Sequence, residues 1–483
     1  MEKHDIRRMA EESIRIGDFD SAWQLLMANR SLIQDDPDLL SILAVIQIAK
    51  GNHQAAERFL LEVLGVFPFH SDLLYNLAFL YELKGRTSAA YRLYTIVHQL
   101  HQEHVPPDVE EALTRVQGAA SSRPRIALVY NSHSGSNTLA LYKLTPDHLR
   151  VKYDVRLVRQ TSGFEFQVEM LDSDLVVTTH GQPRLFPAQP NLELWHGFPL
   201  KAMGLMDKQE NHTALRSYWM KHTDVIASYS TLFTVLMNAT VGKSIDNYVV
   251  TGVPRNDLLF KSNGRELLSQ VLQRSVEDRK VVFFMPTFRQ RSSTVSDGVP
   301  PLENFERLGL WEDEFTALAE KHRILLVIKV HPHEEHQVLS QIASRGLSGH
   351  VCVLREADLQ QHDIDLYEVL NAVDVLVTDY SSVYFDFLLL DRPIVFAMPD
   401  IDEYRSRRGF LLEPVEQWTP GPHVDNAAQF CIELARCLQQ PQYYQTERQH
   451  VSRMVHQYTD GNSALRVWNV IESMLAARQA TDG

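Results

Sequence analysis

An apolar run, a polar turn and a second apolar run follow one another near residue 380. Residues 373–377 have the composition of a buried strand, and the polar residues 378–382 follow them. A helix-length apolar segment at 383–390 and a β-rich run at 394–396 come next. The pattern predicts a strand–loop–helix–strand unit. Two serines at the start of the expected helix offer hydroxyls beside free N–H groups and the positive end of the helix dipole, which favours phosphate.

The same alternation extends over most of the chain after residue 124. We expect strands at 125–130, 175–179, 192–195, 225–228 and 248–251, and then at 280–285, 324–330, 351–354, 373–377 and 394–396. Strands that alternate with helices form parallel, doubly wound sheets. The sequence therefore predicts two Rossmann-like halves, 125–275 on the acceptor side and 276–483 on the donor side. This pair resembles the GT-B architecture of many glycosyltransferases, although a fold alone does not give a reaction.

Small residues recur every 34 positions near the N-terminus. The series are Gly17, Gly51 and Gly85; Ala22, Ala56 and Ala90; and Ala10, Ala44 and Ala78. Helix pairs with glycine at the turn and small residues at the crossing resemble tetratricopeptide repeats. We expect an all-α repeat domain at 1–118 and a linker at 119–124. Such stacks bind peptides or proteins, so a protein partner is expected; an irregular helical bundle with a chance glycine period is the alternative.

Composition limits the class of protein. The 483 residues suggest two or three domains, and the formal net charge of −14 argues against a nucleic-acid binder. The three cysteines form no CxxC pair, and Cys431 and Cys437 lie in a helical pattern typical of buried apolar residues. The N-terminus has no apolar signal segment, and no apolar run is long enough to span a membrane. We expect a cytoplasmic protein, with peripheral contact at the inner face of the cytoplasmic membrane left open.

Distinctive polar motifs follow five of the expected strands. They are WHGFPLK at 195–201, PRND at 254–257, PTFR at 286–289, KVHPH at 329–333 and TDYSS at 378–382. In doubly wound folds, ligands bind at the carboxyl ends of strands. Histidines, cations and hydroxyls gathered there supply a base for an acceptor proton and donors for departing pyrophosphate oxygens.

The order and wording of these motifs resemble the CDP-glycerol glycerophosphotransferase family, the teichoic-acid and capsule polymerases. The family pattern reads WHGTPLK, PRND, PTFR, KxHPH and TDYSS, and the resemblance covers about residues 126–474. Phe198 stands where the family usually has Thr. The resemblance implies an enzyme without metal or cofactor that transfers glycerol phosphate from CDP-glycerol to a hydroxyl and releases CMP. The implied acceptor is a surface glycan or a lipid-linked polyol phosphate.

The resemblance also implies roles for individual residues. The two functional histidines of the family correspond to His196 and His331. We expect His196 to be the general base and His331 to contact the donor diphosphate or the leaving CMP, with the two roles interchangeable. The substrate-binding candidates are Arg289, Lys329, Thr378, Ser381, Ser382, Arg255, Gly197, Lys201 and Glu413.

Two alternatives remain open at this point. One is a transferase of the same build that uses CDP-ribitol or a nucleotide sugar. The other is a repeat scaffold whose transferase half only binds nucleotide.

Residues 172–174 imitate the metal-binding DxD of other glycosyltransferases, but they precede an expected strand, so a turn is the better interpretation.

Overall fold

The chain divides into two compact units. The computed structural model describes residues 2–101, 104–117, 123–161, 163–182, 184–186, 189–207, 212–287 and 301–482. The first unit comprises Met1–Val129, Pro146–Val177 and Pro183–Pro190. The second unit comprises Tyr130–Thr145, Thr178–Gln182 and Asn191–Gly483.

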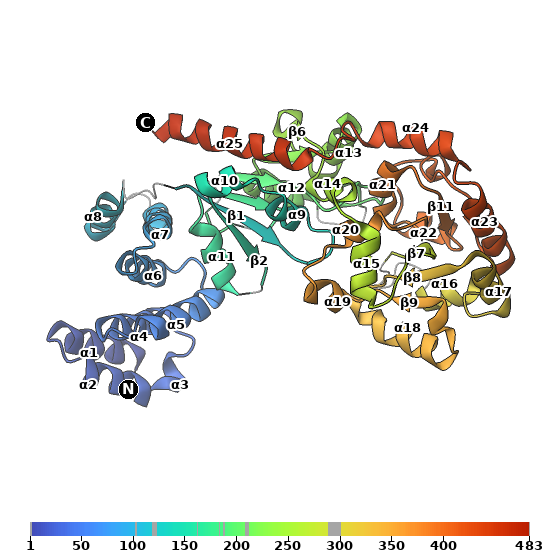
Figure 1. Ribbon diagram of the computed structural model, residues 1–483. Coiled ribbons are helices and arrows are strands. Elements are labelled where there is room, and N and C mark those ends of the chain that lie inside the picture. Colours follow the sequence, from blue (N-terminus) through green and yellow to red (C-terminus); the bar gives the residue numbers. More distant parts are fainter. Residues whose placement is uncertain are drawn as a thin grey trace. The chain divides into compact units, whose positions relative to one another are not determined.

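The first unit begins with helices joined by short turns (Figure 1). They are α1 (Lys3–Arg15), α2 (Phe19–Ala28), α3 (Arg30–Ile33), α4 (Pro37–Ala49), α5 (His53–Val66), α6 (Ser71–Leu83), α7 (Thr87–His101) and α8 (Pro107–Val116). Gly17, Gly51 and Gly85 lie at the turns of the pairs α1/α2, α4/α5 and α6/α7, each with a left-handed φ between 72° and 80°. Glycine adopts this conformation without a Cβ penalty. An N-terminal all-helical region is thus confirmed, whereas its assignment to the tetratricopeptide class remains a prediction.

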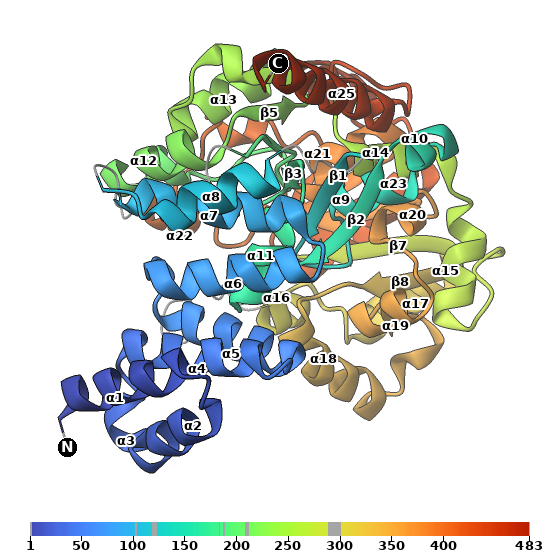
Figure 2. The same ribbon diagram turned by 90° about the vertical axis from the view of Figure 1, so that its left-hand side faces the viewer.

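These helices share an apolar core with a helix of the α/β part of the same unit. Helix α11 (Phe164–Leu171) contacts α5 and α7, as Figure 2 shows. Its side chains Phe164, Val168 and Leu171 are buried in the same cluster as Leu60 and Leu93 of the repeats. The helical region is therefore packed into the first unit and is not joined to it by a linker alone.

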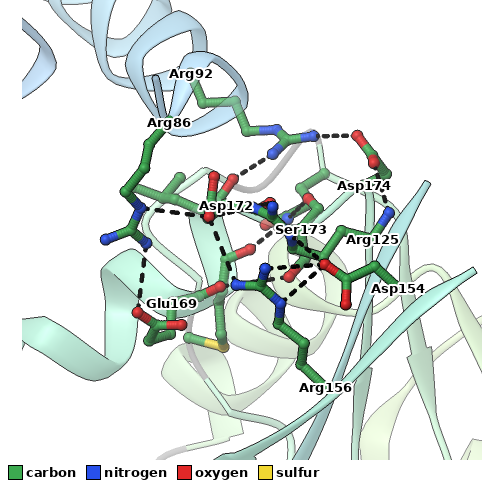
Figure 3. A network of polar contacts seen from close by, with 12 residues as sticks. Arg86, Arg92, Arg125, Asp154, Arg156, Glu169, Asp172, Ser173 and Asp174 are labelled. Carbon is green, nitrogen blue, oxygen red and sulfur yellow. Dashed lines mark hydrogen bonds and ion pairs between the residues drawn. The ribbon is translucent and has the colours of Figure 1, made fainter. Parts of the chain in front are cut away.

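A network of ion pairs reinforces this packing (Figure 3). The buried Arg92 of α7 lies 3.0 Å from Asp174, and its guanidinium also donates to the carbonyl of Leu171. Arg86 lies 3.3 Å from Asp172 and from Glu169. Residues 172–174 thus form an arginine-bound turn before a strand, as the sequence pattern predicts.

Six strands form the first sheet, in the order β2-β1-β3-β4-β5-β6. They are β1 (Arg125–Tyr130), β2 (Asp154–Arg159), β3 (Leu175–Thr178), β4 (Asn191–Glu193), β5 (Val225–Ser228) and β6 (Tyr248–Val250). Ile126 pairs with Leu175 and Ile226 pairs with Tyr248, both in parallel register. The associated helices are α9 (Asn137–Lys143), α10 (Asp147–Lys152), α12 (His212–His222), α13 (Thr231–Val241) and α14 (Pro254–Lys261).

The second sheet lies wholly in the second unit and has the order β12-β11-β10-β7-β8-β9. Its strands are β7 (Lys280–Met285), β8 (Ile324–Ile328), β9 (Val351–Val353), β10 (Val375–Thr378), β11 (Ile394–Ala397) and β12 (His423–Val424). Parallel pairs such as Phe284 with Ile328 and Leu376 with Ile394 set the register. The strand–loop–helix–strand unit is confirmed as β10, a turn, α21 (Val383–Phe387) and β11.

Further helices accompany the second sheet. They are α15 (Gly264–Leu272), α16 (Pro301–Arg307), α17 (Asp313–His322), α18 (Pro332–Ser344), α19 (Glu356–Gln361), α20 (Leu366–Leu370), α22 (Ile401–Arg407), α23 (Ala427–Gln439), α24 (Gln445–Val455) and α25 (Ser463–Asp482). Helix α25 returns to α14, where the carboxylate of Asp257 accepts the N–H groups of Ser463 and Ala464 at 2.9 and 2.8 Å. Among the helices of the described ranges, none combines the length and the apolar character that a membrane crossing requires.

Candidate active site

A polar cavity of about 240 Å³ lies in the second unit. Loops at the carboxyl ends of strands of both sheets surround it, and so do residues of α20 and α21. The lining residues are Asn131, Ser132, Ser134, Gly135, Ser136, Asn137, Thr179, His180, His196, Arg255, Met285, Leu366, Tyr367, Ser381, Ser382 and Val383. Strand ends that are distant in the sequence therefore meet at one place, as expected for paired α/β halves.

His196 follows β4 and lies in the wall of this cavity. Its Nδ1 lies 3.0 Å from the carbonyl oxygen of Thr179, which can only accept a hydrogen bond, so Nδ1 carries the proton of the neutral ring. Nε2 is left as a lone-pair acceptor. The surrounding protein removes hydration from the charged ring and lowers the pKa of His196 to about 4, against the opposing effect of the Thr179 hydrogen bond. The imidazole is thus neutral at physiological pH and has the form that a general base needs.

A second histidine stacks on the first. The rings of His180 and His196 are 4.2 Å apart between centroids and 3° from parallel. Nδ1 of His180 lies 2.9 Å from the hydroxyl oxygen of Thr179. Burial, together with the neighbouring His196 and Arg255, lowers the pKa of His180 to about 3.

The carboxyl group of Glu193 connects the turns that carry these two histidines. Its Oε2 accepts from the Thr178 hydroxyl at 2.7 Å and from the N–H group of Gly181 at 2.9 Å. Its Oε1 accepts from the N–H group of Trp195 at 2.9 Å, where the backbone has a left-handed φ of 56°. Such a conformation is costly for a bulky residue and needs support from its surroundings. Burial raises the pKa of Glu193 to about 7, although these hydrogen bonds oppose the rise.

Two serines and a glycine form another part of the site. Ser381 and Ser382 line the cavity between β10 and α21. A Cβ atom on Gly197 would lie 2.6 Å from the hydroxyl oxygen of Ser382. Glycine is therefore required at this position because the His196 turn passes directly against the serine turn.

Arg255 lines the cavity, but its guanidinium is bound by protein groups. Nη2 lies 2.6 Å from a carboxylate oxygen of the fully buried Asp386. Nη1 donates to the carbonyl oxygens of Gly135 and His196, each at 2.9 Å. Asp386 also accepts from the Tyr367 hydroxyl at 2.6 Å. Arg255 thus binds residues of both predicted α/β halves, the backbone of Gly135 and His196 in the first and the side chain of Asp386 in the second. Its expected contact with a diphosphate remains a prediction.

Other predicted residues lie near strand ends without lining the cavity. The Thr378 hydroxyl is buried and donates to the carbonyl oxygen of Met285 at 2.7 Å. Nζ of Lys201 lies 3.4 Å from the hydroxyl oxygen of Thr287. Lys329 forms ion pairs with Glu356 at 3.2 Å and with Glu335 at 3.9 Å.

Three remaining predictions have different positions. His331 is half-buried between β8 and α18 and is not among the cavity-lining residues. The Glu413 carboxylate accepts from Arg405 at 3.1 Å and from the N–H group of Val415 at 3.0 Å, away from the cavity. Arg289 lies outside the described residues. The roles of all these side chains remain predictions.

Sequence reasoning missed several groups at the site. The polar loop 131–137 after β1 is not among the predicted motifs, and neither His180 nor Asp386 is among the predicted site residues. Like the five strand-end motifs, the loop 131–137 is a cluster of polar residues directly after a buried strand, and this pattern could have identified it. The position of Asp386 within an apolar helical segment was a second available signal, because a buried carboxylate needs a partner.

Known proteins with similar sequences include polymerases of glycerol phosphate and of ribitol phosphate. The profile of a family described as CDP-Glycerol:Poly(glycerophosphate) glycerophosphotransferase matches residues 122–473. The teichoic acid poly(glycerol phosphate) polymerase of Bacillus subtilis (strain 168) is 31% identical over 279 residues, which cover 52% of this chain and 33% of that protein. The ribitol-phosphate polymerase TarK of Staphylococcus aureus (strain NCTC 8325 / PS 47) is 26% identical over 257 residues, with 50% of this chain and 45% of that protein covered. The chain thus spans a third to a half of the length of these two relatives.

A relative of more similar length and a solved structure complete the comparison. The teichoic acid glycerol-phosphate transferase of the same S. aureus strain is 26% identical over 328 residues, covering 63% of this chain and 78% of that protein. A structure of the wall teichoic acid polymerase TagF superposes with a TM-score of 0.60 at 17% identity, covering 80% of this chain and 98% of that one. At this identity the likeness concerns the fold alone, and it confirms the predicted α/β class.

Proposed function

Because the chain belongs to the CDP-glycerol:poly(glycerophosphate) glycerophosphotransferase family, we propose that it transfers glycerol phosphate from CDP-glycerol to a hydroxyl of a surface-glycan acceptor. The observation that carries the proposal is the His196 imidazole. It is neutral, its Nδ1 is fixed by Thr179, and it lines the same cavity as Ser381 and Ser382.

In the proposed reaction, the acceptor hydroxyl oxygen attacks the phosphorus atom that bears glycerol. The new O–P bond forms as the bond to the bridging oxygen breaks, and CMP leaves with that electron pair. The hydroxyl proton passes to Nε2 of His196, and the serine hydroxyls donate to the diphosphate oxygens. His331 is proposed on the donor side, where an N–H group of its imidazole would donate to the donor diphosphate or to the leaving CMP.

CDP-ribitol is the second candidate donor. A ribitol-phosphate polymerase is among the relatives, at an identity similar to that of the glycerol-phosphate transferase. Glycerol and ribitol donors share the CDP group and differ in the polyol, so the same residues would hold the diphosphate of either.

The test is nucleotide release by the purified full chain. CDP-glycerol, CDP-ribitol and a set of UDP-sugars are each incubated with a soluble glycerol phosphate ester that ends in free hydroxyls, with and without chelator. Acceptor-dependent CMP release from CDP-glycerol, unchanged by chelator, supports the proposal. CMP release from CDP-ribitol alone would show that the donor is CDP-ribitol and not CDP-glycerol. UDP release from a UDP-sugar would contradict the glycerophosphotransferase activity.

A protein partner on the repeat helices and contact with the inner membrane face are also proposed. A pocket of about 480 Å³ between α2, α3, α4 and α5 supports the first, since Trp23, Met27 and Phe59 line it. Substitution of Trp23 by Ala should weaken a bound partner without changing turnover of a soluble acceptor. Sedimentation of the full chain with anionic lipid vesicles tests the membrane contact, and absence from the pellet would contradict it.

A further inference from the structure

Two stacked imidazoles form one wall of the cavity. His180 follows β3 and His196 follows β4, and both rings are exposed to the cavity. The Glu193 carboxyl group holds both turns through the N–H groups of Gly181 and Trp195. Gln182 also holds the His180 turn, because its side-chain oxygen accepts a hydrogen bond from the N–H group of His180 at 3.1 Å. The relative position of the two rings is therefore set before any substrate binds.

The hydrogen bonds of Thr179 assign a different tautomer to each ring. The Thr179 carbonyl oxygen accepts from Nδ1 of His196, so Nε2 of that ring is an acceptor. The Thr179 side chain is buried, and its hydroxyl oxygen lies 2.9 Å from Nδ1 of His180. A buried hydroxyl hydrogen needs an acceptor, and we assign Nδ1 of His180 to that role, which places the ring proton on Nε2. Side by side, the wall presents one acceptor and one donor.

We propose that this pair recognises two hydroxyls on adjacent carbons at the end of the acceptor. The reactive hydroxyl donates to Nε2 of His196, and the oxygen of the neighbouring hydroxyl accepts from Nε2–H of His180. His180 exchanges no proton in the reaction; it is a specificity-determining residue that touches the acceptor. The inference rests on the proposed function, and what it adds is the residue, His180, that would read the second hydroxyl of the acceptor.

A neutral hydroxyl fits His180 better than a phosphoryl oxygen does. Phosphate groups gain most from charged donors, whereas His180 offers the N–H of a neutral ring. Arg255, the cation beside the stacked rings, is bound to Asp386 and to two carbonyl oxygens. Ser381 and Ser382, which also line the cavity, have hydroxyl donors for phosphate, so the imidazole pair is free to bind the acceptor.

Two acceptors that differ by one hydroxyl test the inference. One is a soluble glycerol phosphate ester that ends in a vicinal diol, and the other lacks the hydroxyl next to the reactive one. The variants are His180→Phe, which keeps a ring against His196 but has no N–H, and His450→Phe as the control. His450 is exposed on α24 and does not line the cavity.

The full chain should prefer the diol by about tenfold in kcat/KM, which is the worth of one hydrogen bond. His180→Phe should abolish the preference by lowering the value for the diol alone, and His450→Phe should keep it. An unchanged preference in His180→Phe would overturn the inference. An equal loss of kcat/KM with both acceptors, together with a raised KM for the donor, would also overturn it, because His180 would then contact the donor phosphate.

The same two acceptors separate this inference from the proposed function. If the full chain releases no CMP from CDP-glycerol with either acceptor, the proposed function fails. Calorimetric titration then compares binding of the two acceptors to the full chain and to His180→Phe. A tenfold preference for the diol that His180→Phe loses supports the acceptor site, and equal binding overturns it.

Discussion

The backbone of Gly197 passes so close to Ser382 that a larger residue displaces one of the two. A Cβ atom there would lie 2.6 Å from the serine Oγ and 3.3 Å from its Cβ. We expect Gly197→Ala to lower kcat/KM about 100-fold, because displacements of about 1 Å at a reacting site have effects of this size. Steady-state CMP release measures it.

Gly349→Ala is the control for this substitution, because no atom lies within 4 Å of the added Cβ. The control should have the activity of the unsubstituted chain. Full activity in Gly197→Ala would contradict the close approach of the two turns.

The pH profile of turnover reports the state of His196. A general base works in its neutral form, so activity is lost as pH falls through its pKa. Burial lowers the pKa of His196 to about 4. We therefore expect kcat/KM to stay level from pH 8 down to about 5 and to fall below that. The profile is measured on protein shown by circular dichroism to remain folded, and an acid limb centred at 6.5 or above would contradict an imidazole that stays neutral down to about pH 5.

At the scale of the elements, a buried ion pair joins α14 to α21. Arg255 and Asp386 are nearly inaccessible to solvent, and their charged atoms lie 2.6 Å apart. Removing Arg255 leaves the buried Asp386 carboxylate without its cation. We expect Arg255→Met to lower the free energy of unfolding by about 3–5 kcal/mol, measured by denaturant titration.

The exposed pair Arg407–Glu403, at 3.0 Å within α22, gives the matched control. Arg407→Met should change the free energy of unfolding by less than about 1 kcal/mol. Equal effects of the two substitutions would contradict a stabilising role for the buried pair.

Most strands were predictable because buried parallel strands are continuous apolar runs. Residues 280–285 and 125–130 were predicted with the bounds that β7 and β1 have. Strand β2 was missed because charged residues alternate along it, and it lies at the sheet edge, where Asp154 pairs with Arg125 and Arg156. Periodicity alone does not separate such a strand from a polar loop.

The site was predictable only in part, for a related physical reason. Strand-end position identified His196, Ser381 and Ser382, which line one cavity. It did not show that Lys329 is neutralised by two glutamates from other segments. Which partner a side chain meets depends on how turns fold back, and that is set by contacts distant in the sequence.

At the scale of the molecule, the first unit is expected to fold as one body. Phe164, Val168 and Leu171 of α11 are buried by the N-terminal helices, and Arg92 binds Asp174. Removal of residues 1–118 exposes this apolar face and takes Arg86 and Arg92 away from Asp172 and Asp174. We expect the truncated chain to unfold at lower temperature and to aggregate, as measured by calorimetry and light scattering.

A surface substitution within residues 1–118 is the control for the truncation. Arg8→Ala on α1 removes only an exposed partner of Asp5 and should leave the unfolding temperature unchanged. A truncated chain that is as stable and as monodisperse as the full chain would show that the repeats are an independent domain.

The most direct test of the central claim is CMP release from CDP-glycerol by the His196→Ala variant. The account predicts that acceptor-dependent turnover falls at least about 100-fold, the usual contribution of a general base. Donor binding, measured by calorimetry, should stay within about threefold, because the serine turn that holds the diphosphate is unchanged. Turnover close to that of the unsubstituted chain would contradict His196 as the base.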